Sequence, residues 1–520
     1  MQMNFIRTTC PFCGTGCSIN LVVKDGKVVG STPYRRSPVN EGKTCQKGTF
    51  ANELINSEAR ITTPMIKKGD QLAEASWDEA LGVIADKCKG FSGADVAVVA
   101  SANATNEDVY ALKKLAKDVF RTDNFTSIAA VGVDASAGSI EDITNAGCIV
   151  AVGNIVESHP VIAGKIANAK KNGAKVIAID TIYSPMAKMA SEFIKAKPGL
   201  EAQTVKEAAY AIEGESLVVL YPVGMSNSEG TVAAAAKALA DEKGGVFCAL
   251  PAQSNARGVL DIGVDKTFDL VDGKFKAYYI MGEDLGPLDA DFVVVQDSFM
   301  SGSAKSADVV LPAAVYAEVD GTIVNAERRI QLMKKAQEPV GESKPNWEIV
   351  AEVAAKLGND FGFESAEAIF TQIYPDITYE SLLGEGVQKD AKNAVIVEGA
   401  PLAAVSASGD YPFVLTTGPS VWHGFGAAGT MSENCPSLIE AVPAIFVRVN
   451  NADAKNLGIN TGDMVKVSTE KGAIPVAAMI SDDVDEGVIF VPTICIGENC
   501  ICMLTGGERA IAAKIEKEEA

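Results

Sequence analysis

The chain lacks any apolar stretch of the length that crosses a membrane as a helix, about 20 residues. Its longer hydrophobic runs, such as Val96–Ala100, have the length of strands. The N-terminal segment Met1–Arg7 has neither a long apolar core nor a twin-arginine signal. We therefore expect no direct membrane span, and cytoplasmic residence is the simplest expectation.

Basic residues are in the minority. The chain has 67 Asp and Glu residues against 46 Lys and Arg residues, so its formal net charge is −21. A charge of this sign repels nucleic acid and anionic membrane surfaces, and it favours a basic protein partner. We therefore expect no nucleic-acid binding. In a reducing compartment, the 11 cysteines favour metal ligands and buried thiols over a disulfide framework.

Motifs for an independent nucleotide cofactor are also missing. The sequence contains no Walker-type phosphate loop, and Gly153 lies in a turn without the G-x-G-x-x-G pattern. No flavin or nicotinamide site is indicated, so electron transfer by this chain would require partners. We expect redox subunits that contain flavin or iron–sulfur clusters.

The central part of the chain alternates strand-like apolar runs with helical stretches. This alternation is typical of α/β domains, in which helices cover both faces of parallel sheets. The predicted strands are Val96–Ala100, Cys148–Val152, Val176–Asp180, Leu217–Leu220, Val246–Leu250, Ala277–Met281, Phe292–Gln296 and Val309–Leu311. Beyond about Val405, strands separated by Gly, Pro and Asp turns predict a separate β-barrel. Its predicted strands are Phe413–Thr417, Ile445–Val449, Met464–Thr469, Ile474–Ile480 and Val488–Val491.

Four cysteines near the N-terminus have the spacing C-x2-C-x3-C-x27-C. Three thiolates on one tight loop and a fourth from a distant segment can surround one 4Fe-4S cubane. Gly14 and Gly16 let the backbone approach the sulfides. Zinc ribbons usually pair two C-x2-C hairpins, so a cluster is favoured over tetrahedral zinc. The predicted ligands are Cys10, Cys13, Cys17 and Cys45.

The chain resembles the molybdopterin oxidoreductase family, and within it the alpha chains of formate dehydrogenases. Thr9–Cys17 and Lys43–Gly48 look like the cluster-binding start of these chains, and Ala307–Pro312 and Asp320–Arg329 match the family's most recognisable block. Further matches follow in the family's order: Gly153-Asn154 with Glu157–Pro160, Lys197–Gly199, Met281–Asp284, Gln296-Asp297, Leu415–Gly418 and Gly429–Met431.

The resemblance implies a cofactor, molybdopterin guanine dinucleotide with molybdenum or tungsten. Lys47 would then lie between the cluster and the pterin, where a cation stabilises the reduced cluster. The alternative for Lys47 is a solvated surface side chain. The cofactor-binding residues that the resemblance implies are Lys47, Gly153, Asn154, Glu157, Asp180, Gly282, Glu283, Gln296, Asp297, Thr417 and Gly418.

Three groups that formate dehydrogenases use are missing. The family holds the metal with a cysteine or selenocysteine, places a histidine after it and orients formate with an arginine. Residues 124–142, where the metal ligand is expected, contain neither Cys nor His. Leu250–Asn255 has no arginine at the matching position, although Arg257 is close by. We therefore predict no catalytic residue, and these losses argue against retention of the pterin. Oxygen ligands could come from Asp134, Ser136 or Ser139.

The C-terminal region contains four further cysteines in two segments that, in the family, approach the pterin. We predict that they could hold a second iron–sulfur cluster. The alternative is a set of unpaired thiols, because C-x4-C-x-C matches no established ligand spacing. The residues are Cys435, Cys495, Cys500 and Cys502.

These observations predict four domains. They are a 4Fe-4S domain at 1–60, a discontinuous α/β domain at 61–125 plus 313–404, a nucleotide-binding-like α/β domain at 126–312, and a barrel of the double-psi type at 405–520. We read Ile515–Ala520 as a frayed end. The favoured function is an iron–sulfur electron-transfer subunit of a larger redox complex, without the usual catalytic site. The alternatives are an active molybdenum or tungsten oxidoreductase with a non-cysteine metal ligand, and a structural scaffold subunit.

Overall fold

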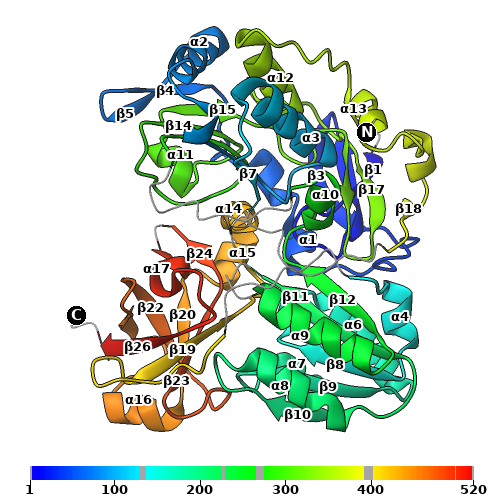
Figure 1. The fold of residues 1–520 in the computed structure, drawn as a ribbon, viewed down its shortest axis with the longest axis vertical. Helices are drawn as coiled ribbons and strands as arrows, with labels where there is room; N and C mark the ends of the chain where they lie inside the picture. Colours follow the sequence, from blue (N-terminus) through cyan, green and yellow to red (C-terminus); the bar gives the residue numbers. More distant parts are fainter. Residues whose placement is uncertain are drawn as a thin grey trace.

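The structure is a computed structural model, and it describes residues 3–127, 136–224, 229–264, 275–391, 402–424, 426–497 and 499–517. Its larger sheets lie around a centre occupied by α14 (Ala427–Glu433) and α15 (Pro436–Ala441), as Figure 1 shows. Within the described residues, no helix is both long enough and apolar enough to cross a membrane.

The N-terminal part is an antiparallel sheet of β1 (Met3–Thr9), β2 (Ser18–Lys24) and β3 (Lys27–Pro33). Residues 10–17 connect β1 to β2, and a hydrogen bond from Cys10 N to Cys17 O, 2.9 Å long, closes this loop. The segment after β3 ends in two short helices, α1 (Gln46–Phe50) and η1 (Glu53–Asn56). Cys45 is therefore the residue that precedes α1.

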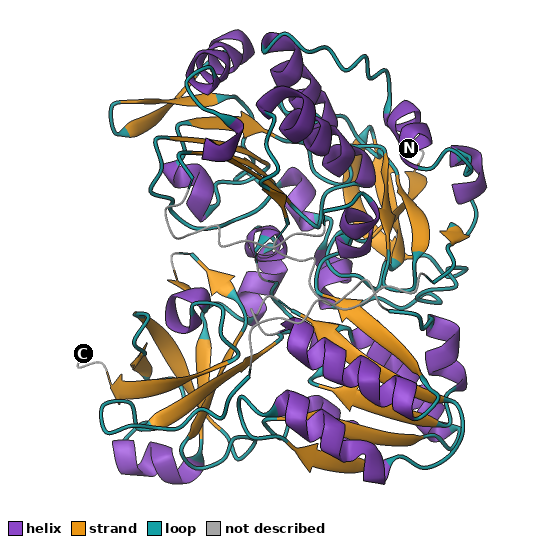
Figure 2. Ribbon diagram, in the orientation of Figure 1, coloured by secondary structure: helices purple, strands orange, loops and turns teal. Residues whose placement is uncertain are grey.

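A seven-stranded sheet forms the core of the upper part of Figures 1 and 2, in the order β5-β4-β15-β14-β13-β6-β7. Its strands from β6 to β15 are parallel, and apolar residues of α2, α3 and α12 cover one face. Helix α2 begins with a capping box formed by Ser76 and Glu79. The elements are β4 (Met65–Lys68), β5 (Gln71–Glu74), α2 (Trp77–Cys88), η2 (Gly93–Asp95), β6 (Val96–Ala100), α3 (Asn106–Lys114), η3 (Leu115–Phe120), β7 (Phe125–Thr126), β13 (Ala277–Met281), β14 (Phe292–Asp297), α11 (Gly302–Ser306), β15 (Val309–Pro312) and α12 (Asn346–Lys356).

This sheet differs from the expected grouping of residues 126–312. Strands β13, β14 and β15 belong to the same sheet as β6, since Ala277–Met281 pairs with Val96–Ala100 along its whole length. The chain leaves this sheet after β7 and returns to it at β13, so the inserted segment is shorter than expected. The sequence did not reveal this because both sheets consist of similar buried apolar strands.

The inserted segment forms a five-stranded parallel sheet in the order β10-β9-β8-β11-β12. Residues of α8 and α9 cover one face, and residues of α4, α6 and α7 cover the other. The elements are α4 (Ile140–Asn145), β8 (Cys148–Val152), α5 (Ile155–Ser158), α6 (Pro160–Lys171), β9 (Lys175–Asp180), α7 (Pro185–Met189), β10 (Glu192–Lys195), α8 (Glu201–Glu207), η4 (Ala208–Ala211), β11 (Leu217–Val223), α9 (Glu229–Glu242), β12 (Val246–Pro251) and α10 (Ala256–Asp261).

A small antiparallel sheet follows the seven-stranded one. It consists of β16 (Gly321–Val324), β17 (Arg329–Met333) and β18 (Val387–Gln388), and α13 (Ala366–Ile373) and η5 (Tyr379–Leu382) pack near it. A buried ion pair between Arg60 and Glu318, 2.8 Å long, joins the end of the N-terminal part to the segment before β16.

The C-terminal part is the predicted barrel, closed in the order β19-β23-β20-β22-β21-β26. The expectation of a frayed end at Ile515 is wrong, because β26 pairs with both β19 and β21 and closes the barrel. Alternate residues of β26, including Ile511 and Ala513, point into its core. The elements are β19 (Phe413–Gly418), β20 (Phe446–Val449), α16 (Asn451–Leu457), β21 (Met464–Ser468), β22 (Ala473–Ile480), β23 (Val488–Pro492), β24 (Cys495–Ile496), β25 (Asn499–Cys500), α17 (Cys502–Thr505) and β26 (Ala510–Lys517).

Candidate functional site

The two parallel sheets each change winding direction once. In the five-stranded sheet, β8 and β11 are neighbours, and the chain runs from β8 to β9 on one side and from β11 to β12 on the other. In the seven-stranded sheet, β6 and β13 are neighbours, and the chain runs from β6 to β7 on one side and from β13 to β14 on the other. Ligands of open α/β sheets bind beyond the carboxyl ends of the strands at such a point. The structure has a cavity at each of them.

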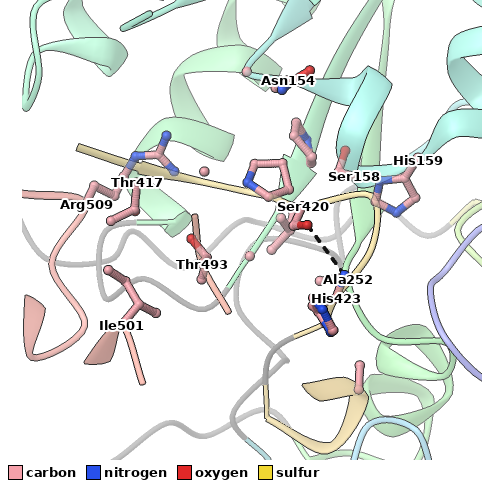
Figure 3. Close-up of a pocket in the computed structure, with 18 of the residues that line it drawn as sticks. Asn154, Ser158, His159, Ala252, Thr417, Ser420, His423, Thr493, Ile501 and Arg509 are labelled. Atoms are coloured by element: carbon pink, nitrogen blue, oxygen red, sulfur yellow. Dashed lines mark hydrogen bonds between the residues drawn. The ribbon is translucent and has the colours of Figure 1, made fainter. Parts of the chain in front are cut away.

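Cavity A lies between the carboxyl ends of β8, β9, β11 and β12 and the barrel, and its empty volume is about 1250 Å³. Gly153, Asp180 and Gly224 line it from the sheet, and Thr417 and Arg509 line it from the barrel. Figure 3 shows these two sides facing each other, with Asn154 and His159 on one and Thr493 and Ile501 on the other. The cavity is therefore formed by segments far apart in the sequence.

Cavity B lies beyond the carboxyl ends of β6, β13, β14 and β15, and its empty volume is about 720 Å³. Ser101 and Gly282 directly follow β6 and β13, Asp297 is the last residue of β14, and all three line the cavity. Thr430 and Met431 of α14 line it from the centre of the molecule. These two cavities, whose walls contain both polar and apolar groups, therefore occupy equivalent places on two similar sheets.

The four N-terminal cysteines lie close enough to influence one another. Burial and then the charges of the other three thiols raise the pKa of Cys17 well above its ordinary value. Cys10 and Cys17 are each 6% exposed. Among the described residues, no three of the four N-terminal sulfur atoms lie within 4.8 Å of one another. They are therefore farther apart than the ligands of a single metal ion. Buried thiols with this wider spacing suit a multi-iron cluster, because its iron ions separate the ligands and replace their protons.

Gly14 holds the cysteine loop against the end of β12. Its N–H donates to Pro251 O at 2.9 Å. A Cβ atom at this position would lie 2.4 Å from the Cγ atom of Pro251, so no larger residue fits. The His159 Nε2 atom lies 2.9 Å from the same carbonyl oxygen. The cluster loop therefore contacts the sheet edge that borders cavity A.

Lys47 lies between the cysteine loop and cavity A. It is 6% exposed, so it is not a solvated surface side chain. Its Nζ atom donates to Ser420 O at 3.3 Å, and it is part of the cavity A wall. Its charge also lowers the pKa of Cys10 and Cys13, against the larger opposite effect of burial. The Lys47 ammonium group thus lowers the pKa of two cluster thiols and also forms part of the wall of cavity A.

The remaining predicted cofactor-binding residues divide into three groups. Cavity A is lined by Gly153, Asn154, Asp180, Thr417 and Gly418, and cavity B by Gly282 and Asp297. Glu157, Glu283 and Gln296 line neither. Glu157 pairs with Arg448 at 3.7 Å, and Glu283 accepts a bond from Ala427 N at 2.7 Å. Gln296 accepts from Tyr279 at 2.7 Å and donates to Asn346 at 2.7 Å, so its side chain is occupied within the fold.

Several buried polar atoms at cavity A have no hydrogen-bond partner within the protein: Asn154 Oδ1, Ser158 Oγ, His159 Nδ1 and Asp180 Oδ2. Burial raises the pKa of Asp180 and lowers the pKa of His159 to about 4, so the imidazole is neutral at pH 7. Burial also raises the pKa of Asp297 at cavity B to about 7. A buried donor or acceptor without a hydrogen-bond partner destabilises the folded protein unless a ligand supplies that partner. These atoms fit a large, hydrogen-bonding ligand such as a pterin dinucleotide.

Sequence reasoning missed a polar group at cavity A. Arg509, just before β26, donates to the Tyr221 hydroxyl at 3.0 Å and pairs with Glu201 at 3.6 Å. His423 and Cys502 also line the cavity. No local spacing predicts this arrangement, because closure of the barrel is what places Arg509 opposite β11.

The residues considered as substitutes for the missing catalytic groups have other roles or lie elsewhere. Ser136 Oγ accepts a bond from Ala249 N at 3.0 Å, and Ser139 caps α4 by accepting from Asp142 N. Asp134 lies outside the described residues. Arg257 is buried and lines neither cavity. Neither serine hydroxyl is thus free to bind a metal without breaking a structural bond.

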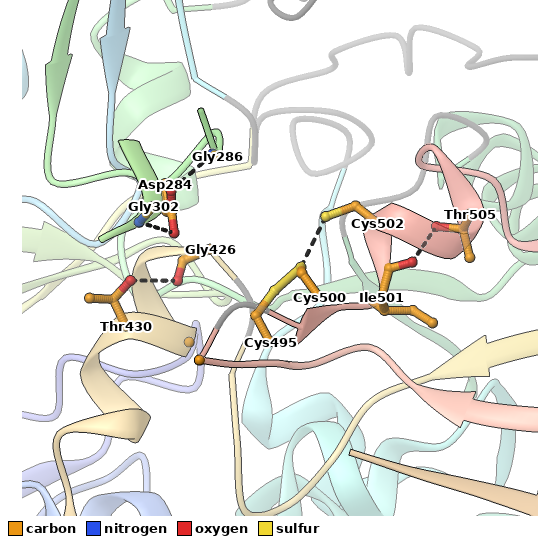
Figure 4. The surroundings of a disulfide bond; sticks show 12 residues. Asp284, Gly286, Gly302, Gly426, Thr430, Cys495, Cys500, Ile501, Cys502 and Thr505 are labelled. Atoms are coloured by element: carbon orange, nitrogen blue, oxygen red, sulfur yellow. Dashed lines mark hydrogen bonds between the residues drawn. A yellow bond between two sulfur atoms is a disulfide. The ribbon is translucent and has the colours of Figure 1, made fainter. Parts of the chain in front are cut away.

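The structure brings together three of the four C-terminal cysteines. Cys495 and Cys500 form a disulfide, contrary to the expectation of reduced thiols, and Cys502 Sγ lies 3.0 Å from Cys500 Sγ (Figure 4). Cys435 is fully buried in a different place, in the apolar cluster that includes Cys10 and Phe12. The predicted set of four therefore does not form one compact group.

Comparison with known proteins agrees with this architecture. The chain is similar to the F420-dependent formate dehydrogenase 2 subunit alpha of Methanococcus maripaludis, with 32% identity over 94% of both chains. It is 31% identical to the F420-dependent formate dehydrogenase subunit alpha of Methanocaldococcus jannaschii, over 95% of both chains. Acetylene hydratase from Pelobacter acetylenicus has the same fold, with a TM-score of 0.73 at 16% identity, covering 98% of this chain and 100% of the other.

Family models match most of the chain. Residues 3–57 match the Fe4S4 domain of molybdopterin oxidoreductases, residues 60–356 the molybdopterin oxidoreductase domain, and residues 413–514 the molybdopterin dinucleotide binding domain. These domains indicate a 4Fe-4S cluster and a molybdopterin dinucleotide as cofactors, so the argument against the pterin that rested on missing catalytic groups is not supported. The chain belongs to the molybdopterin oxidoreductase family.

Proposed function

We propose that this chain is the electron-transferring, formate-dehydrogenase-like subunit of a larger redox complex. Its cluster, on Cys10, Cys13, Cys17 and Cys45, passes electrons between cavity A and a partner subunit. The observation that carries the proposal is the position of Lys47, which is buried between the cysteine loop and the cavity wall. A buried cation at this place favours arrival of an electron on the cluster.

Both cavities suit the two ends of a bulky dinucleotide cofactor. A bound molybdopterin dinucleotide supplies the redox chemistry of its metal. The chain's own groups that would hold it are the unpartnered atoms of Asn154, Ser158 and Asp180 at cavity A and the backbone turn at Gly282 at cavity B. Thr417 and Gly418 line the barrel side of cavity A.

Among the described residues, the side chains considered as substitutes for the missing catalytic groups do not face the cavities, which supports a carrier over a catalyst. Ser136 and Ser139 are engaged in structural hydrogen bonds, and Arg257 does not reach the described cavities. The named relatives are alpha subunits of F420-dependent formate dehydrogenases. We infer from this that the chain works with other subunits, which contain flavin or iron–sulfur clusters.

A second candidate is an active molybdenum or tungsten oxidoreductase. It is favoured by the side chains that the barrel contributes to cavity A, because His423 and Arg509 are of the types that handle protons and carboxylates. These residues come from different segments than those that the family resemblance indicates.

An inventory of cofactors tests the proposal on anaerobically purified protein. Iron, molybdenum, tungsten and pterin are measured in one sample, and the cluster is titrated against potential by electron paramagnetic resonance. We expect about four irons per chain, a reversible one-electron reduction and no oxidation of formate by the isolated chain. Formate oxidation with stoichiometric molybdenum or tungsten would establish the second candidate instead. A cluster that cannot be reduced in the biological range would leave only a scaffold role.

A further inference from the structure

Three cysteines come together beside the barrel. Cys495 and Cys500 face each other on the hairpin of β24 and β25, and Cys502 begins α17. Their three sulfur atoms all lie within 4.8 Å of one another. Figure 4 shows the Cys502 sulfur directed towards Cys500 across the base of the hairpin. No part of the proposed electron path uses these side chains.

The three sulfurs of this group can share one ion once the disulfide is reduced. Cys495 Sγ and Cys500 Sγ are bonded to each other, so reduction must free them first, and Cys502 Sγ lies 3.0 Å from Cys500 Sγ. Among the described residues, no three of the N-terminal sulfurs lie within 4.8 Å of one another. Cys435, which would complete a cluster, lies in the core near Glu53 and Tyr316 instead.

Two acidic groups, Asp284 and Glu433, lie near this hairpin. Asp284 interacts electrostatically with Cys502 and with Glu433. Glu433 accepts a bond from Gly497 N at 2.6 Å and thereby ties α14 to the hairpin. Burial raises the pKa of Glu433 to about 7, and the charge of Asp284 adds to this shift, against a smaller opposing effect of Lys305. Thiolates would add to this negative charge, so a cation among them relieves repulsion.

The group opens towards cavity A. Cys502, Ile501 and Thr505 are part of the cavity wall, and Cys502 is exposed. An ion held by three sulfurs would therefore keep one coordination position directed to the cavity. Zinc sites with three protein ligands and one open position have this arrangement.

We propose that Cys495, Cys500 and Cys502 bind one thiophilic metal ion of the zinc class at the rim of cavity A. The ion replaces the three thiol protons, and no electron is transferred. The Cys495–Cys500 disulfide is the oxidised form of the site. A dithiol reductant opens it by supplying two electrons and two protons and becomes a disulfide itself.

Zinc chloride added to reduced protein with an intact cluster tests this site. Protein is reduced anaerobically with dithiothreitol, incubated with zinc chloride and freed of loose metal, and zinc and iron are measured together. Only samples with at least about four irons per chain are used, so that zinc cannot occupy an empty N-terminal site. We expect one zinc per chain, and zinc K-edge absorption should show three sulfur ligands at about 2.3 Å.

Variants assign the ion to these residues. Cys502→Ser should weaken zinc binding at least tenfold, and Cys495→Ser should do the same. Cys88→Ser, which alters a half-buried thiol on α2, should leave zinc binding unchanged. Alkylation followed by mass spectrometry offers a readout that needs no variant, because zinc should protect all three thiols of the site from modification.

Three results would overturn the proposal. One is reduced protein that retains no zinc. Another is zinc retained equally by Cys502→Ser. The third is an iron content near eight that falls to about four in Cys502→Ser, which would establish a second iron–sulfur cluster. Each of these leaves the proposed electron-transfer role intact, since that role rests on the N-terminal cluster and Lys47.

Discussion

The Nζ atom of Lys47 donates a hydrogen bond to the backbone oxygen of Ser420 at 3.3 Å, and this contact joins helix α1, which directly follows Cys45, to the wall of cavity A. Burial of a charged side chain such as Lys47, which is 6% exposed, is costly in solvation free energy unless nearby anions offset that cost. The cluster and its thiolates are such anions. The Lys47–Ser420 contact therefore holds the positive charge near the cluster at a fixed place in the wall of cavity A.

Replacement of this cation should change the cluster potential. In Lys47→Met the reduced cluster loses a stabilising charge, so its midpoint potential should become more negative by about 50 to 100 mV. Lys43→Met, four positions earlier and on an exposed side chain, is the matched control and should shift the potential far less. Potentiometric titration followed by electron paramagnetic resonance measures both. Equal potentials in Lys47→Met and the unaltered protein would contradict the relay role.

Loss of one ligand should remove the cluster. We expect Cys17→Ala to retain well under half of the iron of the unaltered protein, because three thiolates hold a cubane weakly. Cys148→Ala, which alters an equally buried thiol in β8, should keep its iron. Iron analysis and the visible absorption of the cluster measure this. If Cys17→Ala kept its full iron content, the ligand assignment would be wrong.

Close packing at Gly14 should matter more than at a glycine in open space. A Cβ atom in Gly14→Ala would lie 2.4 Å from Pro251 Cγ, so the loop must move, at a cost of about 1 to 3 kcal/mol. In Gly30→Ala the new atom meets nothing within 4 Å. Thermal unfolding and iron retention should both be impaired in Gly14→Ala and nearly normal in Gly30→Ala. The reverse order would contradict the contact between the cluster loop and β12.

The stability of the fold should depend on pH through Glu107. Burial raises the pKa of this carboxyl group from 4.5 to about 8, although Thr322 donates to it. The folded state thus keeps a proton that the unfolded chain releases above pH 4.5, so the free energy of unfolding falls as the pH rises from 4.5 towards 8.

An uncharged replacement should remove this dependence. Glu107→Gln mimics the protonated acid, so it should be more stable than the unaltered protein well above pH 8 by roughly 5 kcal/mol and similar to it near pH 5. Glu74→Gln, on the exposed strand β5, is the control and should leave the pH profile unchanged. Unfolding midpoints measured across the pH range decide this. Parallel profiles for Glu107→Gln and the unaltered protein would show that the carboxyl group is not buried as described.

Much of the fold was predictable from local sequence. Strands buried on both faces are short apolar runs whatever their neighbours are, so β6, β8 and β13 were predicted with their observed bounds. The capping box at Ser76 and Glu79 was predictable for the same reason, since its two hydrogen bonds involve residues three positions apart. The cysteine spacing indicated the cluster because three of its four ligands lie on one loop.

The partners of those strands could not be predicted in the same way. Residues Ala277–Met281 read as one more buried strand, and nothing in their sequence distinguishes the sheet of β6 from the sheet of β8. Strand β26 was missed because its Ala and charged residues give a weak pattern, and pairing with β19 and β21 stabilises it.

The sequence by itself determined the elements, the cluster-binding loop and the family. Only the tertiary structure decided which side chains surround each cavity. Arg509 meets Tyr221 across 288 positions, and Lys47 meets Ser420 across 373. Contacts of this kind arise when a barrel closes against a sheet, and they leave no periodic trace in the chain. Local spacing therefore reveals a ligand set held on one loop but cannot reveal a cavity assembled from several domains.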